Sequence, residues 1–465
     1  MVFSSLEFLT LFLPATLALY FLCPVRLRNG LLLFASLLFY AWGEPLYVTV
    51  MIGSILLNYV SGRLLGFAKT PKGKKAVLAA SVAANLLILG VFKYGNFVIE
   101  NVNAAGGALP LLELSLPIGI SFFTFQAMSY VIDVYRGKAA VQKNPFSFGL
   151  YIALFPQLIA GPIVRYSTVE AEINHRQPNF DDAAKGVRRF VTGLAKKVIL
   201  ANGAGAIFKA LLAGGAALPV VPAWTAAISY AFQIYFDFSG YSDMAIGLGL
   251  IFGFHFQENF NYPYISQSIT EFWNRWHISL STWFREYLYI PLGGNRKGKL
   301  KQVRNILIVW LLTGLWHGAA WNFILWGVYY GLLLLIEKFA LGKVLEKLPR
   351  AVRHVYAMLV VLFGWVLFAF DDFKVIPVFL GGMFGQNGLT APGTGYFLSE
   401  NVLLLVLAAA ASLPVWKNLA DKYRAKHENG KLLFAAELVW YLTLFLLSVA
   451  SLVAGSYNPF IYFRF

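Results

Sequence analysis

Long apolar runs separated by short polar turns are the main feature of the chain. The first runs cover residues 8–22, 31–42 and 46–60, and the turn Gly43-Glu44-Pro45 joins the last two into a hairpin. A helix needs about 20 mostly apolar residues to cross the hydrocarbon core of a bilayer. The runs continue toward the C-terminus, and they predict an all-α polytopic membrane protein with roughly 10–12 transmembrane helices.

Two segments interrupt this pattern. Residues 145–166 carry Pro156 and the pair Gly161-Pro162 within apolar sequence, and residues 255–300 alternate between aromatic and polar stretches. Irregular backbone does not face lipid, because its N–H and C=O groups would lack hydrogen-bond partners there. We therefore expect both segments to be re-entrant or interfacial pieces that pack inside the protein around a central cavity or tunnel.

The composition agrees with a membrane protein. Residues of the set AVILMFWYC make up 58% of the chain and charged residues only 13%, whereas a soluble domain carries about 25% charged residues. We expect a single transmembrane domain over residues 1–465. The only cysteine is Cys23, so the sequence can form no internal disulfide and no thiolate metal site.

The charge distribution predicts how the chain is oriented. Lys and Arg exceed Asp and Glu by 38 − 22 = 16. In a soluble protein this excess would suggest a nucleic-acid partner, but basic loops that stay in the cytoplasm and contact anionic lipids account for it here. We expect the basic clusters at 63–75, 185–197, 296–304 and 417–431 to share the cytoplasmic side.

The histidines are the first candidates for chemistry. Four of the six lie in polar or basic stretches typical of solvated loops: His175, His255, His354 and His427. His317 differs, because no charged residue stands between Arg304 and Glu337. An ionisable side chain at membrane depth faces an interior path or a partner. His317 is therefore either a functional residue of a cavity or a core histidine hydrogen-bonded to backbone.

His277 lies in an aromatic and polar segment, residues 271–287. The apolar positions of this segment recur at helical spacing: Trp273, Trp276 or His277, Leu280 and Phe284. This spacing predicts an amphipathic interfacial helix, whose inner face still leaves room for a site. Because 317 − 277 = 40 residues separate the two histidines, they can come from different helices and meet in a cavity.

Two carboxylates interrupt the apolar stretch 228–254. Asp237 and Asp243 are its only charged residues, and buried carboxylates at this depth need partners. They form either a proton relay or ion site, or a structural clamp on Arg275, Arg285 or a backbone N–H.

Several motifs recur in the order typical of one known family. They are Tyr235 to Met244, Asn259-Phe260-Asn261-Tyr262-Pro263-Tyr264, Glu271 to Tyr289 followed by Pro291-Leu292-Gly293-Gly294-Asn295-Arg296, Gly314-Leu315-Trp316-His317-Gly318, and the ending Asn458 to Phe463. Together they resemble the membrane-bound O-acyltransferase (MBOAT) superfamily, and more narrowly its bacterial branch of alginate and peptidoglycan O-acetyltransferases. The resemblance covers residues 1–465.

The resemblance implies an MBOAT-type domain that transfers an acyl group to a hydroxyl. His317 falls on the catalytic histidine of the family, and His277 on a second motif position that is often Asn or Asp in eukaryotic members. The implied reaction moves acetyl from a cytoplasmic thioester, expected to be acetyl-CoA, to hydroxyls of an alginate- or peptidoglycan-like polysaccharide outside the cell. The implied location is a bacterial inner membrane, with membrane lipids and an exported acetyltransferase as partners and with no permanently bound cofactor.

Two other functions stay open at this point. One is a D-alanyl transferase that takes its acyl group from a carrier protein and modifies teichoic acid. The other, from a different class, is a non-catalytic proton-coupled transporter that uses His317, Asp237 and Asp243 as a proton path.

The expected chemistry suits the residues. A neutral imidazole can take the proton from an attacking hydroxyl near neutral pH, and desolvation favours the neutral form of His317. The oxyanion would be stabilised by His277, by the backbone near Gly314 or Gly318, or by Asn322. Further substrate or tunnel candidates are Asp237, Tyr241, Asp243, Asn274, Arg275, Trp276, Arg285 and Trp316. The sequence contains no spacing typical of metal ligands.

Overall fold

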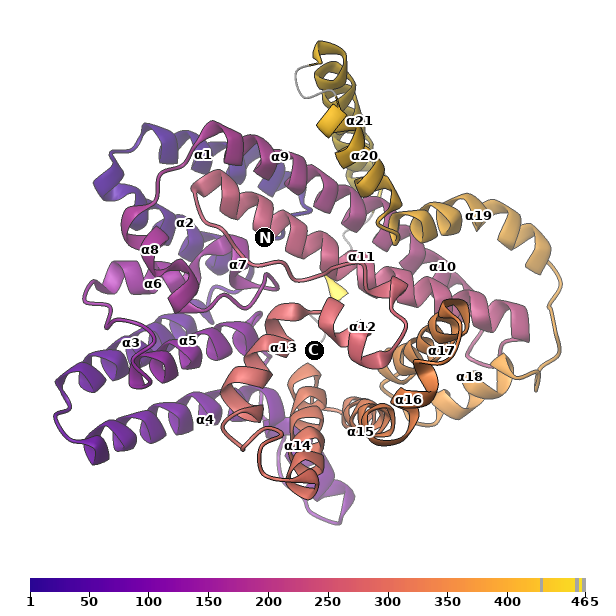
Figure 1. The fold of residues 1–465 in the computed structure, drawn as a ribbon, viewed down its shortest axis with the longest axis horizontal. Coiled ribbons are helices and arrows are strands. Elements are labelled where there is room, and N and C mark those ends of the chain that lie inside the picture. The colour runs from indigo at the N-terminus through magenta and orange to yellow at the C-terminus, as the bar shows by residue number, and fades with distance from the viewer. Residues whose placement is uncertain (427–429, 456–459, 462–465) are drawn as a thin grey trace. The chain divides into compact units, whose positions relative to one another are not determined.

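The fold is all-helical, as the apolar runs predict. A computed structural model describes residues 1–426, 430–455 and 460–461, and no β-strand occurs among them (Figure 1). In chain order the helices are η1 (Phe8–Phe12), α1 (Leu13–Leu22), η2 (Val25–Leu27), α2 (Arg28–Gly43), α3 (Val48–Phe67), α4 (Pro71–Ala104), α5 (Ile120–Tyr135), α6 (Pro145–Ala153), α7 (Phe155–Leu158), α8 (Tyr166–His175), α9 (Phe180–Ala195), η3 (Lys196–Ala201), α10 (Asn202–Leu212), α11 (Val220–Phe252), η4 (Pro263–Ile265), α12 (Ile269–Arg275), α13 (Ile278–Phe284), η5 (Arg285–Tyr289), α14 (Lys299–His317), α15 (Trp321–Ile336), η6 (Glu337–Leu341), α16 (Gly342–Leu345), α17 (Arg350–Ala369), α18 (Val375–Met383), α19 (Thr394–Ala411), α20 (Val415–Lys426) and α21 (Lys431–Ala454).

Seven of the described helices are long and apolar enough to cross a membrane. They are Val48–Phe67, Pro71–Ala104, Phe180–Leu212, Trp321–Leu345, Arg350–Ala369, Thr394–Ala411 and Lys431–Ala454, and a shorter apolar helix covers Phe8–Leu22. The protein is therefore a multi-pass membrane protein. The number is below the expected 10–12 because other expected crossings, such as α5 with 16 residues, are shorter than a full span.

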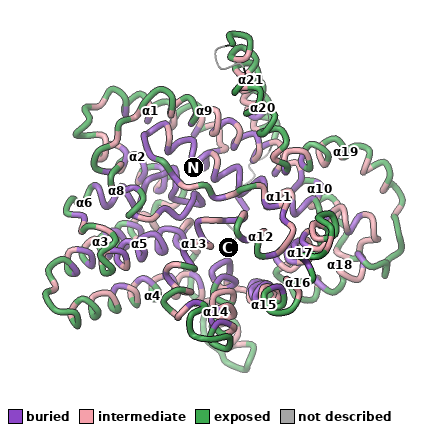
Figure 2. The backbone as a smooth tube through the Cα atoms, viewed as in Figure 1, coloured by how far each residue is buried: buried purple, intermediate pink, exposed green. Residues whose placement is uncertain are grey.

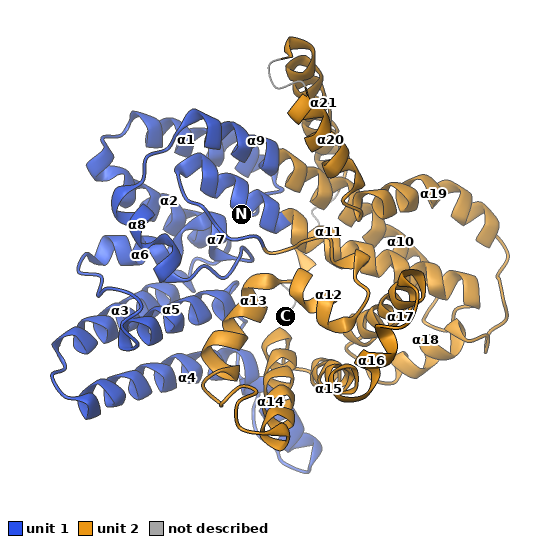
Figure 3. Ribbon diagram, in the orientation of Figure 1, with its two compact units in different colours: residues 1–190, 241–258, 462–464 blue, residues 191–240, 259–461, 465 orange. Residues whose placement is uncertain are grey.

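The described chain divides into two compact units, coloured blue and orange in Figure 3. Unit 1 holds residues 1–190 and 241–258, and unit 2 holds residues 191–240 and 259–461. The single domain expected over residues 1–465 stays a prediction.

The irregular segment of unit 1 is packed inside the protein, as expected for a re-entrant piece. Residues 147–164 are all buried, in the purple part of the tube in Figure 2. Their polar groups have partners within the unit. The Tyr151 hydroxyl donates to the carbonyl oxygens of Gln126 and Val164, at 3.1 and 3.0 Å, and the Phe155 N–H donates to the Ser36 hydroxyl oxygen at 3.0 Å. These bonds meet the demand that apolar surroundings place on irregular backbone.

The irregular segment of unit 2 differs from the expected amphipathic helix. Residues 271–287 do not form one continuous helix, because α12 ends at Arg275 and α13 begins at Ile278. Between them His277 has φ 46° and ψ 54°, which is the left-handed region. Residues other than glycine are uncommon in this region, although Asn, Asp and His enter it more often than the rest. The single stripe of Trp273, Leu280 and Phe284 is therefore divided between two short helices.

In unit 2, α14 and α15 form a tight antiparallel hairpin. A Cβ on Gly314 would lie 2.3 Å from the Phe323 carbonyl oxygen, and one on Gly327 would lie 2.4 Å from the Trp310 carbonyl oxygen. Only glycine leaves room for backbones this close. The hairpin places the basic residues of 296–304 and those of 338–353 at the same end.

The basic cluster at 185–197 is not a loop. Its residues lie on the continuous helix Phe180–Leu212, and Lys197 is buried there in an ion pair with Asp237 of α11. The most buried charge of the cluster is therefore neutralised inside the protein rather than by lipid headgroups. That the cluster shares the cytoplasmic side stays a prediction.

The hairpin gives a testable topology. In a Cys23→Ser background, we expect single cysteines at Lys297 and Lys343 to react with a membrane-impermeant maleimide only after cells are permeabilised. A cysteine at Ala320, in the turn after α14, should react in intact cells, because the 19 residues of α14 span about 28 Å at 1.5 Å each. Labelling of Lys297 and Lys343 on opposite sides would contradict the hairpin topology.

Candidate active site

A cavity of about 640 Å³ in unit 2 contains both histidines that the sequence selected. Short helices α12 and α13 form one wall, and α14 and the segment from α15 to α16 form others. On α14 the lining residues recur on one face: Ile306, Val309, Trp310, Thr313 and His317. Because 317 − 306 = 11 residues rise about 16 Å, the cavity follows α14 for that length, with His317 at one end.

His317 is the last residue of α14 and is 3% exposed. Aromatic rings surround its imidazole: Trp316, Trp326 and Phe368 lie at centroid distances of 5.1, 4.9 and 5.4 Å. The chain can turn directly after it because residue 318 is a glycine, whose Cβ would lie 2.2 Å from the Phe323 ring. Apolar rings exclude water from an imidazole placed in this way, which favours its neutral form.

His277 lies at the break between α12 and α13 and is buried. Its Nδ1 lies 3.1 Å from the Asn259 side-chain oxygen. The Phe238 ring packs edge-on against the imidazole at 4.6 Å, and Trp316 lies at 5.8 Å. Burial lowers the pKa of the His277 imidazole well below its ordinary value, so it is neutral at pH 7.

The other candidates on the short helices divide into two groups. Asn274 and Arg285 line the cavity beside the histidines. Arg275 instead binds the Glu271 carboxylate at 3.0 Å, and Trp276 is buried in an aromatic cluster with Trp365 at 4.8 Å. Arg275 and Trp276 therefore hold α12 in place.

Two further candidates lie close in the chain to His317. The Trp316 ring contacts both imidazoles. Asn322 is fully buried near the start of α15, and its side-chain oxygen and nitrogen have no hydrogen-bond partner among the described residues. Neither residue is among those that line the cavity.

The two aspartates of α11 are each engaged in an ion pair. Asp237 pairs with Lys197 and accepts a hydrogen bond from the Ile461 N–H at 2.7 Å. Asp243 accepts from Arg189 at 2.9 Å, and Arg189 also pairs with Glu258. These partners correspond to a structural clamp. The Ile461 N–H is a backbone partner of the kind expected from the sequence, whereas the arginine and lysine partners are Arg189 and Lys197 instead of Arg275 or Arg285.

Tyr241 lies in unit 1, where its ring stacks on Phe3 with centroids 4.7 Å apart. It is not among the residues that line the cavity of unit 2, and neither are Asp237 and Asp243. The hypothesis of a proton path through the two aspartates therefore has no support from this geometry.

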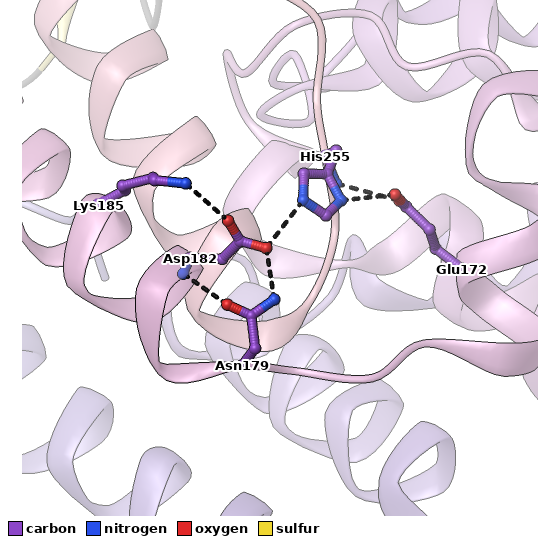
Figure 4. Close-up of polar contacts among 5 residues, drawn as sticks. All are labelled: Glu172, Asn179, Asp182, Lys185 and His255. Carbon is purple, nitrogen blue, oxygen red and sulfur yellow. Dashed lines mark hydrogen bonds and ion pairs between the residues drawn. The ribbon is translucent and has the colours of Figure 1, made fainter.

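His255 is a surface histidine with two acidic neighbours (Figure 4). Its Nδ1 lies 2.7 Å from Glu172 and its Nε2 lies 3.2 Å from Asp182, which also pairs with Lys185. The hydrogen bond to the Glu172 carboxylate raises the pKa of His255. It is thus part of a surface ion-pair network rather than only solvated.

The remaining histidines lie outside the cavity lining. His354 contacts the Ser266 carbonyl oxygen at 3.1 Å, and His175 is exposed at the end of α8. His427 lies outside the described residues, as does the terminal motif except for Phe460 and Ile461. Among the described residues no group of three His, Cys, Asp or Glu side chains could hold a metal ion.

Sequence reasoning missed the charged end of the cavity. Three basic residues line it: Arg285, Lys338 and Arg353. The acids that line it are Glu271, Glu337 and Glu346. Glu337 accepts hydrogen bonds from the N–H groups of Ile269 and Thr270, at 2.6 and 3.0 Å, and Glu271 is paired with Arg275. The N–H groups leave the charge of Glu337 in place. With Glu271 paired to Arg275, the lining sets three basic side chains against the two carboxylates of Glu337 and Glu346, which is a small net positive charge. The signal in the sequence was Glu337, which ends the stretch without charges that begins after Arg304.

Comparisons with known proteins agree with these features. The profile described as MBOAT, membrane-bound O-acyltransferase family, matches residues 120–378, which include both cavity histidines. The chain is 41% identical to a protein of Azotobacter vinelandii named probable alginate O-acetylase AlgI, over all of both chains. It is 35% identical to a peptidoglycan O-acetyltransferase of Helicobacter pylori, over 84% of this chain and 81% of that protein. It is 29% identical to a teichoic acid D-alanyltransferase of Bacillus subtilis, over 56% of this chain and 69% of that protein.

The packing that positions His317 can be tested by substitution. We expect Gly314→Leu to lower the thermal unfolding temperature of the detergent-solubilised protein, because the new side chain would overlap the Phe323 carbonyl. Overpacking of this kind costs about 1–3 kcal/mol or more. The matched control is Gly90→Leu in α4, where no atom lies within 4 Å of a built Cβ. Equal unfolding temperatures for the two variants would contradict the tight crossing.

Proposed function

The chain belongs to the membrane-bound O-acyltransferase family and is an O-acyltransferase. From this premise we propose that it moves acetyl from acetyl-CoA toward hydroxyls of an extracytoplasmic polysaccharide, which acetyl reaches through a partner protein. One observation carries the proposal. Two buried histidines from separate segments line one cavity, and basic side chains line the same cavity. The relatives named O-acetylase and O-acetyltransferase support acetyl as the group transferred.

In the proposed reaction His317 is the general base. The acceptor hydroxyl attacks the carbonyl carbon of the thioester while its proton passes to the imidazole of His317. The new C–O bond forms, the C–S bond breaks, and the proton returns to the departing thiolate. A positioned base contributes about 10²–10⁴ in rate, and the aromatic rings around His317 favour the neutral imidazole that this role needs.

The charge of the cavity supports a phosphate-bearing donor. Arg285, Lys338 and Arg353 can bind phosphate oxygens. Lys338 follows α15, at the end of the hairpin that carries the basic cluster 296–304, which we place in the cytoplasm. Acetyl-CoA is a cytoplasmic thioester with such phosphates. A carrier-protein thioester, as in the D-alanyl alternative, would also present a phosphate group. The D-alanyl relative, however, matches only 56% of this chain.

The relatives also support the acceptor and the membrane. Proteins named for alginate and for peptidoglycan modify exported bacterial polysaccharides, so we place this protein in a bacterial inner membrane and its acceptor outside. The transporter alternative loses support, because Asp237 and Asp243 are each engaged in an ion pair.

The base can be tested directly. We expect His317→Ala to lower acetyl transfer from acetyl-CoA by about 10²–10⁴, while the purified protein keeps its wild-type unfolding temperature. The matched control is His175→Ala, because His175 is exposed and does not line the cavity. Transfer by His317→Ala at a rate near that of the control would overturn the assignment of the base.

The size of the cavity supports a handover to a second protein. A volume of about 640 Å³ suits a small ligand, whose usual pockets measure about 300–1,000 Å³. A polysaccharide chain would also lose many hydrogen bonds to water on entering such a space. We therefore propose that this protein passes acetyl to a separate exported acetyltransferase, which modifies the polymer.

Reconstituted vesicles test the handover. With acetyl-CoA on the face that carries residues 296–304 and alginate alone on the other face, we expect no acetyl ester on the polymer above the level of His317→Ala vesicles. When the exported acetyltransferase is added to the alginate face, acetyl esters should appear on the polymer. Efficient acetylation of alginate by this chain alone would show that it is the complete transferase.

A further inference from the structure

Asn259 connects the two sides of the break at which His277 lies. It is fully buried, 18 residues before the histidine in the chain. Its backbone carbonyl accepts a hydrogen bond from the Ile278 N–H at 3.0 Å. Its side-chain oxygen accepts from the Ser279 N–H at 3.2 Å and from the Ser279 hydroxyl at 2.9 Å. One residue therefore anchors the two residues that follow His277.

These contacts determine which nitrogen of His277 carries the proton. A backbone N–H can only donate, so the Asn259 atom that faces the Ser279 N–H is the amide oxygen. The same oxygen lies 3.1 Å from His277 Nδ1. An oxygen accepts, so Nδ1 must donate and carries the proton. In a neutral imidazole the other nitrogen, Nε2, is then an acceptor.

The left-handed backbone of His277 is the second feature that fixes the orientation of its imidazole. Such a conformation is uncommon in a residue other than glycine and persists only where the surroundings enforce it. Here the hydrogen bonds from Ile278 and Ser279 to Asn259 enforce it. The strained turn places the imidazole in the cavity wall, next to Trp316.

We propose that Asn259 is a positioning residue that fixes His277 as the Nδ1–H tautomer, so that His277 accepts the hydrogen bond of the attacking hydroxyl rather than donating one to the oxyanion. This inference rests on the proposed acyl transfer. In the ground state the hydroxyl donates its proton toward His277 Nε2, which orients the oxygen toward the thioester. As the C–O bond forms, the O–H bond turns from His277 Nε2 to the imidazole of His317, which takes the proton. The C–S bond then breaks, and His317 returns the proton to the departing thiolate.

The pH dependence follows from the acceptor role. Protonation of Nε2 removes its lone pair, so activity should fall as the pH drops through the pKa of His277. The ionisable groups that line the same cavity are Glu271, Arg285, Tyr289, His317, Glu337, Lys338, Glu346 and Arg353. The variants Asn259→Ala, Asn259→Asp and Asn305→Ala keep all of these groups, so a shift caused by a change at residue 259 reports on the contact with His277.

A spectroscopic experiment tests the positioning without any assay of activity. The full chain, labelled with ¹⁵N at histidine and reconstituted in lipid bilayers, is examined by NMR, and the His277 signals are identified by their loss in His277→Gln. We expect a protonated Nδ1 and an unprotonated Nε2 in the wild type, and a mixture of both tautomers in Asn259→Ala. A protonated Nε2 in the wild type, or an unchanged tautomer in Asn259→Ala, would overturn the proposal.

Two variants make the spectroscopic result specific. Asn259→Asp keeps an oxygen acceptor, so we expect it to retain the Nδ1–H tautomer. Asn305→Ala is the matched control, because Asn305 is a fully buried asparagine of the same unit that donates to the Gly294 carbonyl and lies outside the cavity lining. It should leave the tautomer of His277 unchanged, even if the protein becomes less stable.

The activity arm tests the role in catalysis. Asn259→Ala and His277→Ala should lower acetyl transfer from acetyl-CoA by similar factors, and the double variant should be no worse than either, because the two residues act as a unit. In Asn259→Asp the carboxylate should raise the pKa of His277, so the acid limb of the pH–rate profile should move up by about 1–3 pH units.

The outcomes separate this inference from the proposed function. Multiplicative losses in the double variant would overturn the role of Asn259 while leaving acyl transfer intact. Wild-type transfer by His317→Ala, or no transfer from acetyl-CoA by the wild type, would overturn the proposed base or donor. In that case the NMR result still decides whether Asn259 positions His277.

Discussion

The geometry of the candidate site depends on the hydrogen bonds that Asn259 accepts at the break between α12 and α13. An interrupted helix inside a membrane protein leaves N–H and C=O groups that lipid cannot satisfy. The Asn259 carbonyl and side-chain oxygens bind the N–H groups of Ile278 and Ser279 and so satisfy the break from within. The same oxygen holds the imidazole of His277. One buried asparagine thus solves a folding requirement and orients a functional side chain.

The second requirement is close packing of helices on the opposite wall. Gly314 and Gly327 allow the backbones of α14 and α15 to approach, which brings His317 to the end of the cavity and encloses its ring with Trp326 and Phe368. Aromatic rings pack against both imidazoles, Phe238 against His277 and Trp326 and Phe368 against His317. The chemistry of a neutral base therefore follows from packing rather than from a neighbouring charge.

Much of the fold and the two candidate histidines could be predicted from the sequence, but the break in the helix at His277 could not. The turn at 43–45 and the buried segment 147–164 follow from local patterns that the structure keeps. Spacing alone, by contrast, predicted one continuous helix over 271–287. Periodicity counts apolar positions and does not detect a hydrogen bond from a distant residue, so the break at His277 was not foreseen.

The sequence by itself determined the class of protein and selected the two candidate histidines. Hydropathy decides which segments enter a bilayer, and an ionisable side chain in an apolar run is costly unless it faces an interior path or a partner. Only the tertiary structure decided which groups meet. It paired Asp237 with Lys197 and Asp243 with Arg189, and it placed His277 and His317 in one cavity with Arg285. These pairings depend on how helices that are far apart in the chain pack against one another. The spacing of residues along a single segment carries no information about which segments pack together.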